Sequence, residues 1–331
     1  MKESNSLTPK KVALIFGISG QDGGYLAKLL LSKNYHVHGV SRDVDSCVFV
    51  SLKALEIFDK VELHSASLTD FHTTINIIEK VKPDEIYNLS GQSSVGLSFI
   101  QPIETIESII IGVTNILEAL RFLNSKACFY NASSSECFGD TNNGCGNELT
   151  SFNPRSPYAI AKAAAHWQVA NYREGYGLYA CSGILFNHES PLRAPRFVTR
   201  KIISAVVRIS MGSKEKLVLG DLSIHRDWGW APEYVEAMWL MLQQNSPNDY
   251  VIATGKTYSL EDFVKFSFLE VGLNWEKFVD CDVKLFRPSE IKYSCGDATK
   301  ASTQLGWRAN YYLPDIIRHM VNAEKTTQIE I

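Results

Sequence analysis

A short apolar run that passes directly into a glycine-rich turn restricts the fold of this chain more than any other feature. Residues 11–16 have the β-branched, apolar character of a strand, and Gly17, Gly20 and Gly23 follow at G-x-x-G-x-x-G spacing. Glycine lets the backbone turn tightly and come close to a pyrophosphate, and the helix that follows points its N–H groups at that anion. The turn therefore predicts the first β-α unit of a dinucleotide-binding domain.

Strand-like and helix-like segments alternate through the first half of the chain. Strands are expected over residues 11–16, 35–40, 61–66, 85–89, 127–132 and 179–186, and helices over 23–33, 70–81, 103–123 and 157–174. This alternation predicts an α/β fold: a parallel sheet covered by helices on both faces, which right-handed crossovers make doubly wound, of the Rossmann type. We assign residues 9–186 to this domain.

The second half of the chain is less regular and richer in Pro, Trp and charged turns. Helices are expected over residues 197–211, 232–243 and 259–271. We interpret residues 187–325 mainly as a smaller α/β lobe that binds substrate over the carboxyl ends of the strands. The strand-like residues 250–253 are a candidate to return to the main sheet. The boundary between the two domains at residue 186 is therefore not sharp.

Composition excludes several classes of protein. The 331 residues are 45% hydrophobic and 21% charged, with a formal net charge of −3. The chain therefore lacks the excess of basic residues that would indicate a nucleic-acid partner. No apolar run reaches the ~20 residues that span a bilayer, and the polar start lacks a signal peptide, which favours a cytoplasmic protein. The seven cysteines form no C-x-x-C pair, so we expect reduced thiols and no metal site.

The end of the second strand bears on the choice of cofactor. The sequence there is Ser41-Arg42-Asp43. An acidic residue at this point would favour NAD by holding the ribose 2′-hydroxyl, whereas Arg42 can pair with the 2′-phosphate of NADP. Because Arg42 comes first, we expect NADP, with NAD through Asp43 as the alternative.

A tyrosine and a lysine stand four residues apart on an expected helix, at Tyr158 and Lys162. Their side chains share one face, and a nearby ammonium together with an oxidised nicotinamide would lower the pKa of a tyrosine from its usual value near ~10. The pair alone is common by chance. Ser134, upstream at a strand end, adds a hydroxyl that can bind the substrate oxygen, and Glu136 adds a second base. If residues 134–136 stay extended, Ser134 and Glu136 point the same way.

This set of residues resembles the extended short-chain dehydrogenase/reductase superfamily, and Ser134-Ser135-Glu136 resembles the Ser/Thr-x-Glu element of sugar-nucleotide 4,6-dehydratases. Longer stretches resemble the GDP-mannose 4,6-dehydratase family over nearly the whole chain. They are residues 87–93, 153–158, 171–174, 183–191, 197–201, 226–229 and 251–255.

The resemblance implies a role for each site residue. Ser134, Glu136, Tyr158 and Lys162 would be catalytic, and the last two would also contact the cofactor. The other implied cofactor-binding residues are Gly17, Ser19, Gly20, Gln21, Asp22, Gly23, Arg42, Ser67, Leu68, Leu89, Ser90 and Gly91. The implied substrate-binding residues are Ser93, Asn187, Val198, Lys201, Arg226, Arg287 and Glu290. The cationic residues suit a diphosphate, and a carboxylate such as Glu290 suits the N–H groups of guanine. Each of these charges could instead form an ordinary surface ion pair.

The implied reaction is a 4,6-dehydration of a GDP-linked sugar to its 4-keto-6-deoxy product. The alternatives are a C4 epimerase, a C4 dehydrogenase or reductase, and a non-catalytic nucleotide-sugar-binding protein. Three positions depart from the family: Ser67 replaces an Asp, Ser94 replaces a His, and Arg42 is followed by Asp43 rather than a second base. Because of these changes, GDP-manno-heptose is a possible substrate as well as GDP-mannose. The resemblance to the extended superfamily implies a homodimer through the helices over 103–123 and 157–174. The segment 44–55, which in relatives reaches a neighbouring subunit, is short and apolar here and puts a tetramer in doubt.

Overall fold

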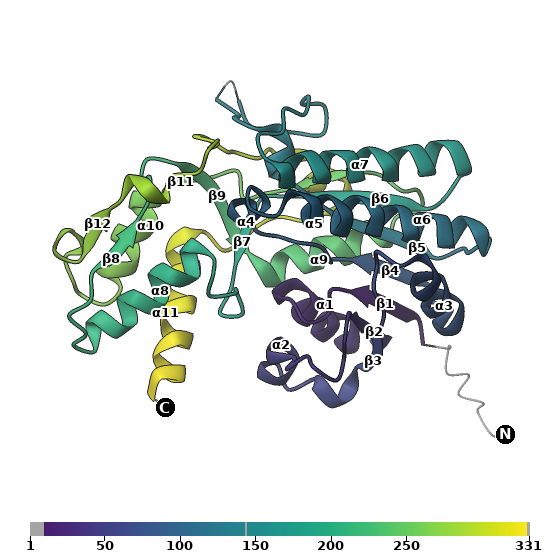
Figure 1. The fold of residues 1–331 in the computed structure, drawn as a ribbon, viewed down its shortest axis with the longest axis horizontal. Helices are drawn as coiled ribbons and strands as arrows, with labels where there is room; N and C mark the ends of the chain where they lie inside the picture. Colours follow the sequence, from purple (N-terminus) through teal and green to yellow (C-terminus); the bar gives the residue numbers. More distant parts are fainter. Residues whose placement is uncertain (1–9, 143, 330–331) are drawn as a thin grey trace.

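The computed structural model describes residues 10–142 and 144–329, so the expected domain start at residue 9 lies outside them (Figure 1). A large sheet of seven strands forms the centre of the molecule, and neighbouring strands all pair in parallel. In spatial order the strands are β10 (Tyr250–Ile252), β6 (Ala180–Leu185), β5 (Cys128–Ser134), β4 (Glu85–Asn88), β1 (Val12–Phe16), β2 (His36–Ser41) and β3 (Glu62–Ser65).

The strand order confirms the expected Rossmann-type fold. Strands β3, β2 and β1 extend the sheet in one direction and β4, β5 and β6 in the other, so the chain reverses its course between β1 and β4. Ligands of doubly wound sheets bind at the carboxyl ends of the strands beside such a reversal. Strand β10 joins the far edge beside β6, which confirms the return of residues 250–252 to the main sheet.

Helices cover both faces of this sheet, because the strands are apolar on both sides. On one face lie α3 (Phe71–Val81), α6 (Gly112–Phe122) and α7 (Pro157–Tyr176). On the other lie α1 (Gln21–Ser32) and α9 (Ala231–Leu242). Helix α9 comes from the second half of the chain and packs on α1, so that half contributes to the large domain as well as to the smaller lobe.

The expected helix over residues 103–123 consists of three consecutive pieces. They are α5 (Pro102–Ile106), a π-helical turn η2 (Glu107–Ile111) and α6. The π turn borders the loop that follows β4, where the Gln92 N–H donates to Ser108 Oγ at 3.2 Å. Single π turns of this kind are frequent at functional sites.

A smaller lobe extends from one end of the large sheet (Figure 1). It contains a three-stranded sheet of β11 (Thr257–Ser259), β9 (His225–Trp230) and β7 (Asn187–Glu189), and a pair formed by β12 (Val279–Cys281) and β8 (Leu217–Leu219). Its apolar core lies among α8 (Val198–Ser210), α10 (Leu260–Leu269) and α11 (Leu313–Ile329). The remaining short helices are α2 (Val50–Ala54), α4 (Val95–Ser98), η1 (Phe58–Lys60), η3 (Ser135–Phe138), η4 (Trp275–Lys277), η5 (Val283–Leu285) and η6 (Ala301–Leu305).

The expectation of reduced thiols is wrong for one pair of cysteines. Cys145 and Cys295 form a disulfide between segments 150 residues apart in the sequence. Tertiary structure brings them together, because the neighbouring residues Gly146 and Gly296 form an isolated β-bridge. Spacing along the chain gives no sign of such a contact. Cys137 and Cys181 are free and buried, as expected for thiols in apolar surroundings.

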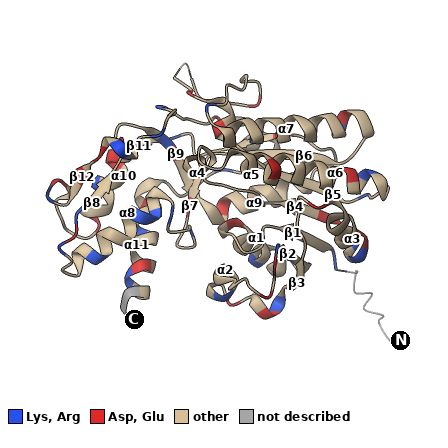
Figure 2. Cartoon of the chain, viewed as in Figure 1, with Lys and Arg blue, Asp and Glu red and all other residues tan. Residues whose placement is uncertain are grey.

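Charged side chains of both signs are interspersed over the two parts of the molecule (Figure 2). Within the described residues, no helix combines the length and the apolar character that crossing a bilayer requires.

Candidate active site

The glycine turn follows β1 at the carboxyl edge of the sheet. Gly17 has φ +85°, and a Cβ there would lie 2.8 Å from the Leu89 carbonyl group. At Gly23 a Cβ would lie 2.4 Å from the Gly17 carbonyl oxygen. A side chain at either position would force the turn away from β4 or from the start of α1. Ser19 and Gly20 are exposed directly before α1, so the backbone there can meet an anion.

Two predicted cofactor residues at the start of α1 make side-chain contacts with the segment of β7. Gln21 Oε1 accepts a hydrogen bond from Ser190 Oγ at 2.7 Å, and Asp22 Oδ2 lies 3.0 Å from His188 Nε2. Burial opposes ionisation of Asp22, but the charge and hydrogen bond of His188 outweigh it and lower the pKa of Asp22 to about 2. These contacts attach the glycine turn to the second half of the chain. A role in cofactor binding stays a prediction for both side chains.

Arg42 and Asp43, which follow β2, differ in whether their side chains are available to bind a ligand. Arg42 is exposed. Asp43 Oδ1 accepts hydrogen bonds from the backbone N–H groups of Asp45 at 3.0 Å and Ser46 at 3.3 Å. The side-chain hydrogen bond from Ser46 is the largest cause that lowers the pKa of Asp43. The aspartate therefore stabilises its own turn, while the arginine remains available to a ligand.

Ser67 and Leu68 follow β3 at the same edge of the sheet. Ser67 Oγ lies 2.9 Å from Thr69 Oγ1, so its hydroxyl is engaged within its own loop. The Leu68 carbonyl accepts a hydrogen bond of 2.7 Å from Asn115 Nδ2, which fixes the loop to α6.

Leu89, Ser90 and Gly91 follow β4 and lie beside the glycine turn. The Leu89 N–H donates to the Phe16 carbonyl at 3.0 Å, and Ser90 Oγ donates to Asn88 Oδ1 at 2.6 Å. Gly91 has φ +112°, a conformation that favours glycine. The structure thus brings the predicted cofactor residues of four loops to one edge of the sheet.

Ser134 and Glu136 lie at the end of β5, but the segment does not stay extended as the sequence argument required. The strand ends at Ser134, and η3 begins at Ser135. Ser134 Oγ accepts a hydrogen bond from the Glu136 N–H at 3.3 Å and so caps this short helix. Asx and Ser caps favour such a change of course at the end of a strand. The carboxylate is therefore positioned by a turn and not by strand alternation.

Helix α7 positions Tyr158 and Lys162. Ser156 caps its first turn by accepting a hydrogen bond from the Ala159 N–H at 3.1 Å, and Pro157 occupies the first helical position. Tyr158 is therefore on the first turn, and Lys162 lies one turn further along the same face.

The charge relation between these two side chains differs from the expectation. Lys162 Nζ donates to the Ala132 carbonyl at 2.7 Å and lies 5.8 Å from the centroid of the Tyr158 ring. Burial raises the pKa of Tyr158, against the effect of the Ser134 hydroxyl, and burial lowers the pKa of Lys162 to about 8. The protein alone therefore does not produce the expected lowering of the tyrosine pKa. That effect would require the positive charge of an oxidised cofactor.

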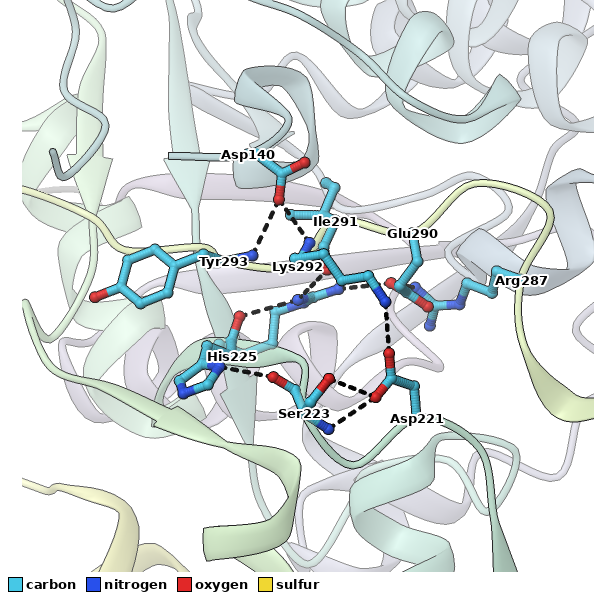
Figure 3. Close-up of polar contacts among 10 residues, drawn as sticks. Asp140, Asp221, Ser223, His225, Arg287, Glu290, Ile291, Lys292 and Tyr293 are labelled. Atoms are coloured by element: carbon cyan, nitrogen blue, oxygen red, sulfur yellow. Dashed lines mark hydrogen bonds and ion pairs between the residues drawn. The ribbon is translucent and has the colours of Figure 1, made fainter. Parts of the chain in front are cut away.

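Three predicted substrate residues form one ion-pair group, of which Figure 3 labels Arg287 and Glu290. Glu290 Oε1 accepts from Arg226 Nη2 at 2.8 Å and from Arg287 Nη1 at 3.1 Å. Arg226 Nη1 also donates to the His225 and Ile291 carbonyls, at 2.9 and 2.8 Å. Two cations share one carboxylate, so the group keeps one positive charge. The ion pair that the sequence left open is formed, and a role in substrate binding stays a prediction.

This group influences the predicted catalytic carboxylate. Burial raises the pKa of Glu136, and the charges of Arg226 and Arg287 oppose that increase, whereas Glu290 and Asp140 add to it. Glu136, which follows the end of β5, is therefore electrostatically coupled to the arginines of the smaller lobe. A carboxyl group whose pKa is raised in this way can both take and return a proton.

Two aspartates fix the segment that carries Arg287 and Glu290 (Figure 3). Asp140 Oδ1 accepts hydrogen bonds from the backbone N–H groups of Lys292 and Tyr293, at 2.6 and 3.0 Å. Asp221 Oδ2 pairs with Lys292 Nζ at 2.6 Å, and Asp221 Oδ1 accepts from Ser223 Oγ. Because Asp140 follows η3, it joins the loop of Glu136 to the lobe.

The other predicted substrate residues are less closely grouped. Asn187 begins β7 and Val198 begins α8. Lys201 is exposed, and its Nζ donates to the Val218 carbonyl at 2.7 Å, so the structure gives it a partner within the lobe.

Two arginines near the site were missed by the sequence argument. Arg193 Nε lies 3.2 Å from the buried Glu189 Oε2, and the charge of Arg193 opposes the raised pKa of Tyr158. Arg196 Nη2 donates to Ser93 Oγ at 3.2 Å, which joins the loop after β7 to the loop after β4. Both lie in the run Leu-Arg-Ala-Pro-Arg-Phe, where two cations in a proline-containing loop after a strand were the available signal.

The fold and the site together define a class of protein. A parallel sheet of Rossmann strand order carries Ser134, Tyr158 and Lys162 at the carboxyl edge, with a glycine turn after the first strand. This is the arrangement of the short-chain dehydrogenase/reductase superfamily in its extended form.

Comparison with known proteins makes the assignment more specific. The family model described as GDP-mannose 4,6 dehydratase matches residues 14–320. GDP-mannose 4,6 dehydratase 2 of Arabidopsis thaliana is 46% identical over 332 residues, which cover 97% of this chain and 89% of that protein. The chain therefore belongs to the GDP-mannose 4,6-dehydratase family.

Solved structures of more distant proteins share the fold. The dTDP-glucose 4,6-dehydratase of Bacillus anthracis, in complex with NAD, has a TM-score of 0.84 at 17% identity, over 96% of this chain and 98% of that one. The RMD protein of Pseudomonas aeruginosa, complexed with NADPH, has a TM-score of 0.79 at 18% identity, over 96% of this chain and 100% of that one.

Proposed function

We propose that this protein is a nicotinamide-dependent GDP-sugar 4,6-dehydratase. It converts GDP-mannose or GDP-manno-heptose to the 4-keto-6-deoxy sugar. The observation that carries the proposal is Glu136, a carboxyl group whose pKa is raised by burial, placed beside Ser134 and Tyr158. A simple dehydrogenase needs the hydroxyl, the tyrosine and the lysine but no such second acid and base.

Each side chain has a separate task in this reaction. Ser134 binds the sugar O4 and Tyr158 removes the proton of the 4-hydroxyl. The 4-ketone that results makes the neighbouring C5–H acidic, so Glu136 can remove that proton. Glu136 then gives its proton to the departing 6-hydroxyl, which leaves as water. Lys162 is held by the Ala132 carbonyl and orients the cofactor ribose.

The residues present fit a dinucleotide. The tight approach at Gly17 and Gly23 and the exposed backbone at Ser19 and Gly20 leave room for a pyrophosphate at the start of α1. The Asp22 carboxylate beside this turn is paired with His188, which reduces its repulsion of an anion. When bound, the nicotinamide supplies a hydride acceptor for C4 and a hydride donor for C6.

One incubation tests the proposal. The purified protein is given each GDP-sugar with NADP, and the product is analysed by mass spectrometry for the loss of one water molecule. Water loss without net formation of reduced cofactor supports the dehydratase. Inversion at C4 without a change of mass would instead identify an epimerase, and net cofactor turnover a dehydrogenase or reductase. Binding without any conversion would identify a non-catalytic binding protein.

The cofactor is proposed to be NADP. Arg42 is exposed at the end of β2, whereas the carboxylate of Asp43 is engaged by two N–H groups of its own turn. A guanidinium can bind a 2′-phosphate through charge-assisted hydrogen bonds. Fluorescence titration with NADPH and NADH is the test. Arg42→Ala should weaken NADPH binding and spare NADH binding, and tighter binding of NADH to the unaltered protein would refute the proposal.

The protein is also proposed to be a homodimer through the helices α5 to α7. Large apolar side chains are exposed on these helices: Ile103 is 71% exposed, Ile160 51% and Trp167 62%. Exposed large apolar side chains on neighbouring helices favour contact with another protein surface. Light scattering after gel filtration should give twice the monomer mass, and Trp167→Glu should give the monomer. A wild-type monomer at micromolar concentration would contradict the dimer.

A further inference from the structure

Three histidines and a glutamate gather on one face of the large sheet, on the neighbouring strands β2 and β3. His36 and His38 lie on β2, and Glu62 and His64 on β3. The pairing of His38 with Glu62 in parallel register puts alternate residues of both strands on the same face. Arg42 lies four residues beyond His38 on an extended chain, about 13 Å away. His64 pairs with Val40 and therefore lies nearer to Arg42. His36, His38 and Glu62 are therefore separate from the predicted cofactor residues, and His64 lies between them and the carboxyl edge.

The donor atoms of the cluster face one another. His36 Nε2 lies 3.6 Å from Glu62 Oε2, and His38 Nδ1 lies 3.7 Å from the same oxygen. The donor atoms of these three residues all lie within 4.8 Å of one another. His64 Nε2 is 3.6 Å from Glu62 Oε1 and 2.9 Å from His38 Nδ1. Zinc bonds of about 2.0–2.1 Å at tetrahedral angles would separate ligand atoms by about 3.3 Å. The two contacts of Glu62 Oε2 with His36 and His38, at 3.6 and 3.7 Å, are close to that separation.

Burial and access also suit a bound ion. His38 and His64 are 7% and 8% exposed as whole residues, and their rings stack at 5.2 Å. The side chains of His36 and Glu62 are about half exposed, so an ion can enter from solvent. At the contact of 2.9 Å between His38 and His64, one ring nitrogen must offer a lone pair. The Lys80 charge acts on both of these histidines and opposes a cation, whereas the Glu62 carboxylate favours one.

We propose that this histidine cluster is a binding site for a divalent transition-metal ion of the zinc type. His36, His38 and Glu62 are the ligands, and His64 is the candidate for the fourth position. Imidazole and carboxylate together are a ligand set that zinc accepts in proteins. Strand β3 is the edge of the large sheet, so an ion bound to both β2 and β3 fastens that edge strand to its neighbour. The site is structural, and its ligands come from two strands that are adjacent in space.

The test uses the full-length protein with any affinity tag removed and with metal stripped by a chelator. Zn²⁺ is titrated by calorimetry, and Co²⁺ is added separately to observe the visible d–d absorption of a four-coordinate site. We expect one equivalent of Zn²⁺, a cobalt band, and a higher melting temperature with Zn²⁺, because an ion that binds only the folded state stabilises it.

Variants distinguish this cluster from other ligands on the surface. His36→Ala and Glu62→Gln alter half-exposed side chains, so the fold should persist, and each should weaken Zn²⁺ binding at least about 10-fold. His72→Ala, at an exposed histidine of α3, is the matched control and should bind as the wild type does. Absence of uptake by the wild type would overturn the site. So would equal affinity in the wild type and the double variant His36→Ala/Glu62→Gln, because the ion would then bind elsewhere, for example at the free cysteines.

Discussion

The large sheet and the smaller lobe hold their functional side chains by different means. In the large domain, Ser134, Tyr158 and Lys162 lie on β5 and α7, two regular elements that pack directly on each other. In the lobe, Arg226 and Arg287 are oriented by a shared carboxylate, that of Glu290. Regular backbone elements position the first group, whereas the guanidinium groups of the second depend on the Glu290 ion pairs, which for Arg226 are joined by two hydrogen bonds to backbone carbonyls.

This difference matches the two tasks of the candidate site, which are proton transfer and binding of the charged substrate. Proton transfer depends on distances that must not change, and a strand beside a capped helix supplies such rigidity. Substrate charge must be accommodated on binding, and ion pairs between side chains can exchange partners with a phosphate. Substitutions in the large domain should therefore affect the chemical steps, whereas those in the lobe should affect substrate binding and stability.

The largest effect is expected at Tyr158. Tyr158→Phe removes the base for the 4-hydroxyl and should lower kcat by about 10²–10⁴-fold, the contribution that a positioned base typically makes. Stopped-flow absorbance of the reduced cofactor measures this step directly. Tyr176→Phe, on the exposed last turn of the same helix, is the control. A rate near that of the wild type would remove Tyr158 from the mechanism.

Glu136→Gln should separate the two halves of the reaction. Oxidation at C4 should continue, so reduced cofactor accumulates in a single turnover, while loss of water slows by about 10²-fold or more. Glu270→Gln, at the exposed end of α10, should behave as the wild type. Equal loss of both steps would count against a separate role for the carboxylate.

The same variant has a pH-dependent effect on stability. Burial raises the pKa of Glu136 above its usual 4.5, so the folded state binds this proton more tightly than the unfolded state does. The stability that the protonated group contributes is lost as pH rises through the raised pKa. Glu136→Gln should therefore melt at a higher temperature than the wild type near pH 8, and the difference should disappear below about pH 4. A lower melting temperature at pH 8 would contradict this sign.

Arg226→Met should reveal the different character of the lobe. Arg226 is 5% exposed and bonds to Glu290 and to two backbone carbonyls, so its loss should cost about 3 kcal/mol of unfolding free energy. The KM for the GDP-sugar should rise more than kcat falls. Urea denaturation and steady-state kinetics measure the two effects. Arg318→Met, at an exposed surface ion pair, should change the unfolding free energy by less than about 0.5 kcal/mol.

The smallest effect is expected where the two regions meet. Asp140→Asn weakens the two hydrogen bonds that join the Glu136 loop to residues 292 and 293, at a cost of about 1 kcal/mol. The KM should rise a few-fold with kcat nearly unchanged, as steady-state kinetics with a GDP-sugar can show. A larger fall in kcat than rise in KM would mean that the lobe also positions the chemical steps.

Periodicity predicted the regular part of the molecule and much of its site. The strands of the large sheet, the glycine turn and the Tyr158–Lys162 helix follow from local pattern, because backbone hydrogen bonding and alternation of side chains are local properties. The π turn of residues 107–111, the η3 turn at Glu136 and the lowered pKa of Lys162 were not predicted. The pKa of Lys162 depends on burial between segments that are distant in the sequence, whereas the η3 turn arises from a local cap by Ser134 that the strand pattern does not reveal.

The amino-acid sequence by itself determined the order of the elements, the parallel sheet and the presence of Ser134, Glu136, Tyr158 and Lys162 in one chain. Only the tertiary structure decided how these groups interact with the rest of the molecule. It paired Arg226 and Arg287 with one carboxylate, joined Cys145 to Cys295 and collected the histidine cluster across β2 and β3. The physical reason is the distance along the sequence over which each kind of interaction acts. Hydrogen bonds of helices and turns join near neighbours, whereas ion pairs, disulfides and metal ligands join whatever the fold brings within a few ångströms.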